Sequence, residues 1–361
     1  MNDAPGTVDV TVVTVTYDAA GLVRACLDGL RAQELGDVTM SVVVVDNGSR
    51  DGTADLVAAE YPEVRLVAHP VNAGFTGGNN VALAGVRSRY AVLLNNDAVP
   101  DPTFVATLVR AMDGAAPDVA AMAATVLLAA RFRPAGPEDG LDGTHVVHGP
   151  DGSWVEDPDG PVRLVNSTGN EVRTDGFGVD RGWLADASRH RPARDVFGFS
   201  GAAAILRTSA LRTVGLFDER LFMYYEDTDL SWRLRLAGYR VEHCAGAVVS
   251  HVHAASSSEG SDFFRFHDMR NRLAVVTKNA SAALALRCVL RFGLTTASVG
   301  LRRRQPWPLV RTRLRAARSY LGLLPHLLAE RRRTGRAAVV DRRTVDALLV
   351  PPTTATGPYR A

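Results

Sequence analysis

Three carboxylates fall within four residues of the chain, at Glu226, Asp227 and Asp229, where a segment with helical periodicity begins. Acidic residues at a helix N-terminus can simply complement the helix dipole. Here, however, aromatic residues precede the run, and Trp232 and Arg233 follow one turn later. A carboxylate aimed into a cleft from such a helix can accept a proton as a general base. We expect Asp227 to act in this way, with Asp229 or Arg233 fixing its orientation.

A second set of side chains has the chemistry of a metal site. Asp97 follows the apolar run 92–94, and Mg²⁺ typically takes one or two protein carboxylates and completes its shell with phosphates and water. His251, with His253 near it, ends another apolar run. A neutral imidazole there could complete the shell of Mg²⁺ or Mn²⁺. A turn residue before Pro100 and a structural histidine are the alternatives.

Two further motifs could hold a nucleotide. Asp46 ends an apolar run and opens the turn at 47–49. Its carboxylate could accept the imide N–H of uracil or thymine, or could instead form an Asx turn or a helix cap. Residues 72–80 form a Gly-rich turn into a helix, which lets the backbone approach a ligand closely. This segment lacks the G-x-G-x-x-G spacing of dinucleotide-binding proteins.

These positions can form one site if the first 130 residues fold as a parallel sheet. Short β-branched runs alternate there with longer segments of helical period, which is the pattern of strands joined by crossover helices. The expected strands are 8–16, 41–45, 64–67, 91–94 and 119–126. Ligands bind beyond the carboxyl ends of such strands. Four segments lie at those ends, namely 16–17, 46–49, 69–72 and 95–97.

The rest of the chain changes character twice. Residues 131–195 are rich in Gly, Pro and Asp, which predicts a loop-rich insertion with short hairpins. Ordered structure then resumes, and a glycine can end a helix in the left-handed conformation. We expect a strand at 196–206, a short helix at 209–214, a helix at 226–237 ended by Gly238, a strand at 239–252 and helices within 263–335.

Charge is distributed unevenly along the chain. Residues 284–361 contain 16 of the 41 Lys and Arg residues but three acidic residues, so this segment carries a net charge of +13 and the remainder −11. Such a basic tail favours an anionic partner, either a membrane surface or a nucleic acid. Residues 282–301, interrupted by Arg287 and Arg291, could lie in a membrane interface or pack on the body of the protein. Because the tail lacks the interleaved aromatic residues of single-strand binders, we expect no nucleic-acid partner.

Targeting signals and cysteines narrow the protein class further. The first residues lack the basic and apolar regions of a signal peptide, and no span of about 20 uncharged apolar residues predicts a transmembrane helix. We therefore expect a cytoplasmic protein that is peripheral on the inner face of the cell membrane. Cys26, Cys244 and Cys288 have neither metal-type spacing nor the even number of a disulfide framework, so we expect buried thiols.

Taken in order, these elements resemble the family 2 glycosyltransferases, in particular bacterial rhamnosyltransferase-like and galactofuranosyltransferase-like members. The resemblance covers residues 8–280. It rests on segments 13–17, 45–49, 72–80, 94–97, 201–218, 225–233 and 238–239. It implies an α/β protein with the GT-A fold, which has a Rossmann-like, mostly parallel central sheet flanked by helices, here with a C-terminal helical extension. The implied regions are a nucleotide-sugar-binding half at 1–130, the insertion at 131–195, an acceptor-binding and catalytic half at 196–280, and a basic helical region at 281–361.

The resemblance also implies roles for single residues. Asp97 occupies the last position of the family's Asp-x-Asp metal motif, His251 matches a metal-binding histidine of some relatives, and Asp227 matches the catalytic base. The nucleotide-sugar donor would be bound by Thr14, Tyr17, Asp46, Asn72, Gly74, Asn79, Asn95, Asn96 and Gly201. The acceptor side would be supported by Glu226, Asp229, Trp232 and Arg233. The chain departs from the family at Asn95, which replaces the first Asp of the metal motif.

The activity implied is a metal-dependent, inverting sugar transfer in a single displacement. We expect dTDP-rhamnose as the donor, with UDP-galactofuranose second, and a hydroxyl of a polyprenyl-linked saccharide or cell-envelope glycan as the acceptor. A nucleotidyltransferase would usually carry a Gly-rich loop with basic residues near its first strand, and residues 14–21 contain none. A non-catalytic carbohydrate-binding or scaffold protein would keep the fold without needing Asp97 and Asp227. The oligomeric state stays open.

Overall fold

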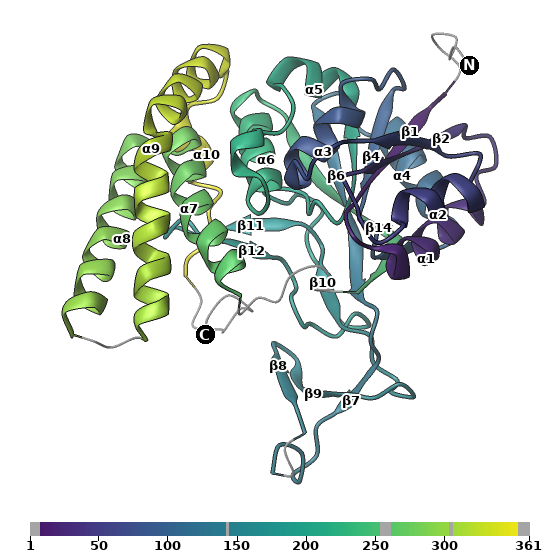
Figure 1. Cartoon of the computed structure of the whole chain (residues 1–361), viewed down its shortest axis with the longest axis horizontal. Helices are drawn as coiled ribbons and strands as arrows, with labels where there is room; N and C mark the ends of the chain where they lie inside the picture. Colours follow the sequence, from purple (N-terminus) through teal and green to yellow (C-terminus); the bar gives the residue numbers. More distant parts are fainter. Residues whose placement is uncertain (1–7, 142–143, 253–260, 303–305, 353–361) are drawn as a thin grey trace.

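The computed structural model describes residues 8–141, 144–252, 261–302 and 306–352. A central mixed sheet with helices on both faces forms the body, a small sheet projects from it, and the C-terminal helices stand against one side (Figure 1). The expected α/β class, with a mostly parallel sheet and a C-terminal helical extension, is confirmed. His253 lies outside the described residues.

The central sheet has nine strands in the order β3-β2-β1-β4-β13-β6-β14-β5, with β10 paired to β6. Strands β3, β2, β1 and β4 are parallel, as are β6 and β14, whereas β13, β5 and β10 run antiparallel to their neighbours. The bounds are β1 Val10–Thr16, β2 Met40–Asp46, β3 Arg65–Ala68, β4 Tyr90–Leu94, β5 Ala98–Pro100, β6 Val119–Leu128, β10 Val165–Ser167, β13 Ala203–Arg207 and β14 Arg240–His251.

The strand expected at 196–206 is shorter in the structure. Only β13 pairs with β4 and β6, and Gly198 and Gly201 lie in the irregular segment before it. Glycine weakens a strand interior and lets another backbone approach closely. A β-carbon at Gly198 would meet the Ser231 side chain. This segment is therefore a turn over the end of the sheet rather than a strand.

Both faces of the sheet are buried, which explains why its strands are nearly continuous apolar runs. On β1, Val10 and Val12 belong to one core and Val13 to the other. Helices α1 Ala20–Arg31, α2 Thr53–Glu60 and α4 Phe104–Asp113 cover the first core. Helices α3 Gly74–Leu83, α5 Thr208–Val214 and α6 Glu226–Leu236 cover the second. Helix α6 ends as expected, with Gly238 at φ +86°.

The insertion has two parts with different positions. Strands β7 Phe132–Pro134, β8 Val146–Gly149 and β9 Gly152–Glu156 form the projecting three-stranded sheet (Figure 1). Residues 165–180 instead return to the body, where β10 extends the central sheet and β11 Asn170–Val172 pairs with β12 Gly178–Asp180. The short hairpins are as predicted, but β10 belongs to the central sheet and β11 with β12 forms a separate two-stranded sheet.

The C-terminal helices share a third core with α6. They are α7 Asp262–Asn279, α8 Ala282–Arg302, α9 Trp307–Ala337 and α10 Arg342–Asp346. Trp232 of α6, Cys288 of α8 and Tyr320 of α9 lie in this core, so the basic helices pack on the body. The stretch Ala282–Gly300 of α8 is long and apolar enough to cross a membrane by length and composition, with 22% of it buried. All three cysteines are buried and free, as expected.

Candidate active site

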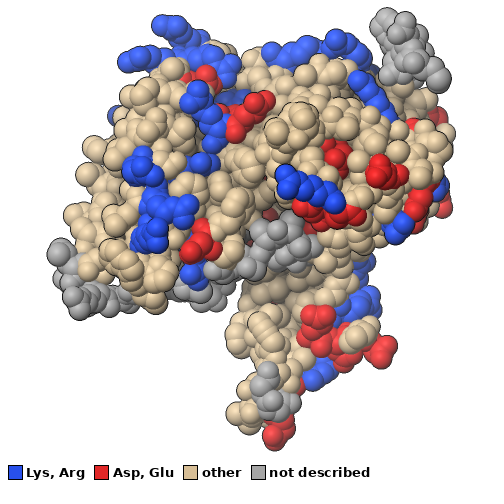
Figure 2. Space-filling model, viewed as in Figure 1, with Lys and Arg blue, Asp and Glu red and all other residues tan. Residues whose placement is uncertain are grey.

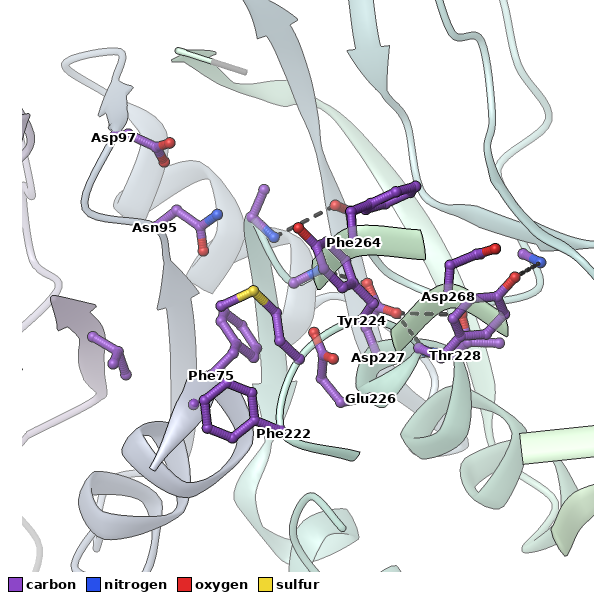
Figure 3. A pocket seen from close by; sticks show the side chains of 18 of the residues that line it. Phe75, Asn95, Asp97, Phe222, Tyr224, Glu226, Asp227, Thr228, Phe264 and Asp268 are labelled. Carbon is purple, nitrogen blue, oxygen red and sulfur yellow. Dashed lines mark hydrogen bonds between the residues drawn. The ribbon is translucent and has the colours of Figure 1, made fainter. Parts of the chain in front are cut away.

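A cavity of about 510 Å³ opens where β1, β4 and β14 end. Figure 3 shows Asp97 and Asn95 at one end, Asp227 and Glu226 in the middle, and Asp268 at the far end. The predicted site residues that line it are Tyr17, Asn72, Gly74, Asn95, Asn96, Asp97, Gly201, Glu226, Asp227 and His251. Strand ends that are far apart in the sequence thus contribute to one pocket, as parallel-sheet geometry predicts.

Three predicted donor-binding residues, Thr14, Asp46 and Asn79, lie behind the cavity wall. All are buried, and the Asn79 amide donates to the Phe75 carbonyl at 2.8 Å. Asp46 Oδ2 accepts the Ser49 backbone N–H at 3.1 Å, so the Asx-turn alternative holds for this oxygen. Asp46 Oδ1 is buried and has no hydrogen-bond partner among the described residues. Asp46 does not line the cavity, so a ligand N–H could reach this oxygen only after the side chain or its neighbours moved.

Two asparagines hold the Gly-rich turn in place. The Asn47 amide donates to Asn72 Oδ1 at 3.1 Å and to the Gly74 carbonyl at 3.0 Å, and Asn72 Oδ1 also accepts the Gly74 N–H at 2.9 Å. Gly74 has φ +72°, and a β-carbon there would clash with the Phe222 carbonyl oxygen. The Phe222 carbonyl also accepts the Thr76 N–H at 3.2 Å. This contact joins the donor-side turn to the segment that leads into α6.

Asp97 and His251 converge at the first end of the cavity. Asp97 Oδ1 lies 3.0 Å from His251 Nε2, yet it is buried and accepts no hydrogen bond in the described part of the chain. Adjacent ligands of an octahedral ion with bonds of about 2.1 Å are separated by about 3 Å. One carboxylate and one imidazole leave most of a coordination shell to phosphate and water. Among the described residues no group of three or more ligating side chains occurs. The spacing and donor atoms of the pair fit a divalent ion that shares its shell with a substrate phosphate.

Asp227 is surrounded by hydrogen-bond donors. Its Oδ2 accepts the Gly201 N–H at 3.0 Å, and its Oδ1 accepts the Thr228 N–H at 2.6 Å. Removal from bulk water raises the pKa of Asp227 above its ordinary value, while the bonds from Gly201, from the Asn170 amide and from Thr228 oppose that rise. A carboxylate with a raised pKa, oriented toward a cavity, suits proton abstraction.

A second acid, Glu226, lies next to Asp227. Burial raises the pKa of Glu226 well above its ordinary value, and the charge of Asp227 adds to the effect. Glu226 Oε2 is buried with no hydrogen-bond partner among the residues described. Burial thus raises the pKa of Glu226 more than that of Asp227, which leaves Asp227 the stronger acid of the pair.

Asp229, Trp232 and Arg233, which are expected to support the acceptor side, do not line the cavity. Asp229 is fully buried against Arg233 Nε at 2.9 Å and Lys278 Nζ at 3.0 Å. Trp232 packs edge-on against Phe197. The Arg233 guanidinium donates to the carbonyls at the end of α5, for example to Val214 at 2.7 Å. They stay within the fold because positions 229, 232 and 233 share one helix face, which points away from the pocket.

Several lining residues were not predicted as site residues. They come from the insertion and from α7: Asn166, Asn170, Gly178, Asp180, Phe263, Phe264 and Asp268. Asp268 is a further acid of the cavity wall, beside Glu226 and Asp227. Burial raises its pKa to about 6, against the opposing effects of Arg272 and of Tyr225. Only a slight signal in the sequence marks these residues as part of the site. Asn166 and Asn170 bracket a short polar run after apolar Leu164 and Val165, which is also the composition of an ordinary turn.

Comparison with known proteins shows the family to which this chain belongs. The family model described as glycosyl transferase family 2 matches residues 11–131, and the one described as glycosyl transferase family group 2 matches residues 171–343. The N-acetylglucosaminyl-diphospho-decaprenol L-rhamnosyltransferase of Mycobacterium tuberculosis is 30% identical over 253 residues, covering 68% of this chain and 76% of that protein. The chain belongs to glycosyl transferase family 2.

The chain is also similar to a second mycobacterial protein and to a solved structure, both at lower identity. The pre-mycofactocin glycosyltransferase of M. tuberculosis is 26% identical over 246 residues, covering 68% of this chain and 43% of that protein. Among solved structures, GalNAc-T7 with UDP, GalNAc and Mn²⁺ superposes with a TM-score of 0.55 at 10% identity, covering 89% of this chain and 57% of that one. The structural likeness concerns the fold alone, which is GT-A-like.

Proposed function

We propose that this glycosyltransferase moves rhamnose from dTDP-rhamnose to a hydroxyl of a lipid-linked or cell-envelope glycan, in a single inverting displacement that depends on a divalent metal. The observation that carries the proposal is the placement of the Asp97–His251 pair and of Asp227 along one cavity. The donor would be held mainly by residues 1–130 and the acceptor activated by residues 196–280. Residues 131–195 would shape acceptor choice.

Asp227 would be the general base. It would take the proton of the acceptor hydroxyl while that oxygen bonds to the anomeric carbon and the bond from this carbon to the diphosphate oxygen breaks. Attack opposite to the leaving group inverts the configuration, and no covalent enzyme intermediate forms. The Gly201 N–H and the Asn170 amide would hold the carboxylate in place during the transfer.

Asp97 and His251 would hold the divalent ion. Such an ion supplies Lewis-acid stabilisation of the charge that grows on the departing diphosphate. Two protein ligands suffice for Mg²⁺ or Mn²⁺ when phosphate oxygens and water complete the shell. Because Asn95 replaces a carboxylate at the edge of this site, we expect the ion to bind tightly only together with the nucleotide.

The nucleotide would lie at the first end of the cavity. Tyr17 lies at the rim, where 44% of it is exposed. Asp46 Oδ1, which has no partner among the described residues, would accept the imide N–H of thymine or uracil once the side chain turned toward the cavity. The transferred sugar would then face Phe75 and Met223. Their apolar surface suits the methyl group of a 6-deoxyhexose, which supports rhamnose over galactofuranose.

The acceptor would enter past an aromatic wall. Phe222, Tyr224, Phe263 and Phe264 line that part of the cavity, and Phe222 lies edge-on to Phe263 with ring centroids 6.1 Å apart. Aromatic rings offer apolar faces to the C–H groups of a sugar ring while their neighbours supply hydrogen bonds. The carboxyl of Asp268 beside them could bind sugar hydroxyls. This arrangement supports a glycan as the acceptor.

The basic helices would bring the site to an anionic membrane surface on the cytoplasmic side. Figure 2 shows basic side chains gathered over the C-terminal helices. On α9, exposed apolar and basic residues alternate with a spacing of four and three from Trp307 to Leu321, and Leu328 and Arg332 continue the same face seven and eleven residues further on. The stripe consists of Trp307, Arg311, Leu314, Arg318, Leu321, Leu328 and Arg332. Apolar side chains between cations are typical of interfacial helices. The arginines at 302–304 have no described side chains.

A donor screen tests the proposal. Purified protein is incubated with a polyprenyl-diphosphate-linked N-acetylglucosamine acceptor, Mn²⁺ or Mg²⁺, and either dTDP-rhamnose or UDP-galactofuranose. We expect nucleoside diphosphate release and a product one deoxyhexose heavier with the first donor, and NMR should show inverted configuration at the new linkage. A product of retained configuration, or no turnover of any nucleotide sugar, would contradict the proposal.

A further inference from the structure

Glu226 differs from the other two acids of its run, because one of its carboxyl oxygens has no partner. Asp229 pairs with Arg233 and Lys278 at 2.9 and 3.0 Å. Asp227 accepts two backbone N–H groups, at 3.0 and 2.6 Å. The Oε2 atom of Glu226, in contrast, is buried and takes part in no hydrogen bond within the described part of the chain.

Such an oxygen is costly to the fold. Folding removes the water around the carboxyl of Glu226 and supplies no bond to Oε2 in exchange. A glutamate in the first turn of a helix can complement the helix dipole while it reaches solvent, but Glu226 is only 7% exposed. Buried polar groups in native proteins are nearly all hydrogen-bonded. An orphaned oxygen in the wall of a cavity therefore points to a ligand that supplies the missing bond.

The carboxyl of Glu226 lies in the donor half of the cavity. Figure 3 shows it on the side of Asp227 that faces Phe75, whereas Asp268 lies on the other side. A β-carbon at Gly201 would lie 3.0 Å from the Phe75 ring and 3.7 Å from Asp227 Oδ2, so this ring borders the proposed base. The transferred sugar is placed against Phe75 in the proposed function, and Glu226 faces the same space.

The backbone before α6 holds Glu226 in this position. Tyr224 and Tyr225 both have φ of 70°, so the chain changes direction immediately before the helix begins at Glu226. Upstream, the Phe222 carbonyl accepts the Thr76 N–H at 3.2 Å. The backbone that presents Glu226 is thus joined to the turn that forms the donor side of the cavity.

We propose that Glu226 is a specificity-determining residue of this glycosyltransferase, whose carboxyl forms a hydrogen bond with a hydroxyl of the transferred sugar. This inference rests on the proposed function for the presence of a sugar in that part of the cavity. From the sequence we expect Glu226 to support the acceptor side, whereas its position favours the donor sugar. A sugar without a hydroxyl at that point would leave the buried carboxyl orphaned, and the site would therefore disfavour it.

The binding of a nucleotide sugar, compared with that of its nucleotide, tests the contact. Calorimetric titration of the full chain with Mn²⁺ gives dissociation constants for dTDP-rhamnose and dTDP, and for UDP-galactofuranose and UDP. In Glu226→Ala the constant for the nucleotide sugar, divided by that for the nucleotide, should rise about tenfold or more. Glu226→Gln keeps an acceptor and a donor, so its ratio should stay within roughly threefold of the wild type. Equal ratios in the two variants would overturn the inference.

The stability of the ligand-free protein gives a second measurement. Glu226→Met replaces the orphaned carboxyl with an apolar side chain of similar length. Because the carboxyl oxygen has no partner to lose, this variant should melt at the temperature of the wild type or above it. A residue that holds the fold together would behave in the opposite way. A clear fall in the melting temperature of Glu226→Met would mean that Glu226 is structural.

A matched change outside the cavity completes the experiment. Glu219 precedes α6 in the same segment, is exposed and does not line the cavity, so Glu219→Ala should leave the ratio of dissociation constants unchanged. A wild-type ratio in Glu226→Ala would defeat the inference and leave the proposed function intact. If the wild type binds neither nucleotide sugar, the proposed function fails, and the melting temperature of Glu226→Met then decides whether the orphaned carboxyl belongs to a binding site.

Discussion

The side-chain amide of Asn271 donates to the main-chain carbonyl of Tyr224 at 2.8 Å. The same amide also reaches the carbonyls of Leu221 at 2.9 Å and Met223 at 2.8 Å. Tyr224 and Tyr225, which lead into α6, both have φ of 70°, a conformation that costs a non-glycine residue on the order of 1 kcal/mol or more. Asn271, which is fully buried on α7, therefore stabilises the strained segment that presents Asp227.

Replacing Asn271 should uncouple α7 from this segment. We expect Asn271→Ala to lower kcat at least tenfold, because the strained backbone can relax and shift the start of α6, while Mn²⁺ affinity stays within a factor of two or so. Transfer rates and Mn²⁺ titration measure the two effects. Asn279→Ala is a useful comparison, since it removes a buried amide that contacts Asp229 at 2.7 Å and no carbonyl of this segment. Equal effects of the two substitutions on kcat would contradict the role given to Asn271.

Asp227→Asn should separate donor binding from transfer. The amide keeps the size of the side chain but cannot accept a proton, so transfer should fall by a factor of about 10² to 10⁴ while dTDP still raises the melting temperature. Radiolabelled transfer and thermal unfolding measure these effects. Glu226→Gln should lose far less, because burial raises the pKa of Glu226 and so favours its protonated form, for which glutamine is a close substitute. Near-normal transfer by Asp227→Asn would remove Asp227 from the role of base.

The raised pKa of Asp227 predicts a specific pH dependence. A base must be deprotonated to act, so the rate should fall as pH falls through the pKa of Asp227, which burial holds above the ordinary value of 3.8. Rate profiles at saturating donor should therefore show an acidic limb of unit slope that begins above pH 4 or so. A flat profile down to pH 4, in an enzyme that remains folded, is the outcome that speaks against it.

Removal of the metal should affect the first end of the cavity only. We expect EDTA to abolish transfer and added Mn²⁺ or Mg²⁺ to restore it. Asp97→Ala and His251→Ala should each weaken Mn²⁺ binding by a factor of roughly 10 to 100. Asp101→Ala serves as a comparison, because Asp101 lies close in sequence but does not line the cavity. Full activity of the EDTA-treated protein would exclude a metal requirement.

Lys278 links the acidic run of α6 to the rest of the fold. Its ammonium lies 2.8 Å from Asp218 Oδ2 and 3.0 Å from Asp229 Oδ2, and it is almost fully buried. Lys278→Met leaves two buried carboxylates without this cation, so it should destabilise the fold by about 3–5 kcal/mol in urea denaturation. Arg24→Ala, which breaks an exposed pair with Glu60, should leave the midpoint where it is.

The same cluster predicts acid sensitivity. Although burial acts to raise it, Lys278 and His326 bring the pKa of Asp218 down to about 2 from 3.8. A carboxyl whose pKa is lower in the folded state contributes stability above pH 3.8, and this contribution is lost as pH falls toward 2. Urea midpoints of the wild type should thus decline between pH 4 and pH 2 or so. In Asp218→Asn this decline should be smaller, and an identical decline would count against the assignment.

The exposed stripe of α9 predicts vesicle binding. Leu314→Glu and Leu321→Glu, at positions that are 50% and 60% exposed, should weaken sedimentation with anionic phospholipid vesicles several-fold without lowering the melting temperature. Substituting Glu at Leu141, which is 81% exposed on the projecting part of the insertion, is the matched change elsewhere. Unaltered sedimentation of both stripe variants would argue against a membrane role for α9.

Much of the fold could be predicted because its signals are local. The β-branched runs of β1, β2 and β4 mark buried parallel strands, and their ends place Asp97 near Tyr17 in the structure. The inward orientation of Asp229, Trp232 and Arg233 could also be predicted from the sequence. Their spacing of three and four places them on one helix face, which lies opposite the pocket. These residues do not line the cavity, and their support of the acceptor side stays a prediction.

The contacts of Asn166 with His251, of Asn170 with Gly198 and of Asn271 with Tyr224 could not be predicted in the same way. Each depends on a pairing between segments far apart in the chain, such as β10 with β6, and a lone asparagine in a turn has no periodicity. Gly198 and Gly201 posed the same difficulty, because a turn and a strand with two small residues look alike until the neighbouring backbone is known. Roles set by partners are therefore the part that a single sequence leaves open.

Because the insertion has two parts, exchanging segments of it between related proteins has different consequences for each part. The projecting sheet of β7, β8 and β9 touches neither Asp227 nor His251, whereas residues 165–180 supply groups to both ends of the pocket. A chimera that imports a foreign loop between 131 and 164 would keep the native catalytic frame. One that replaces the whole of 131–195 would also replace the residues of 166–180 that line the pocket.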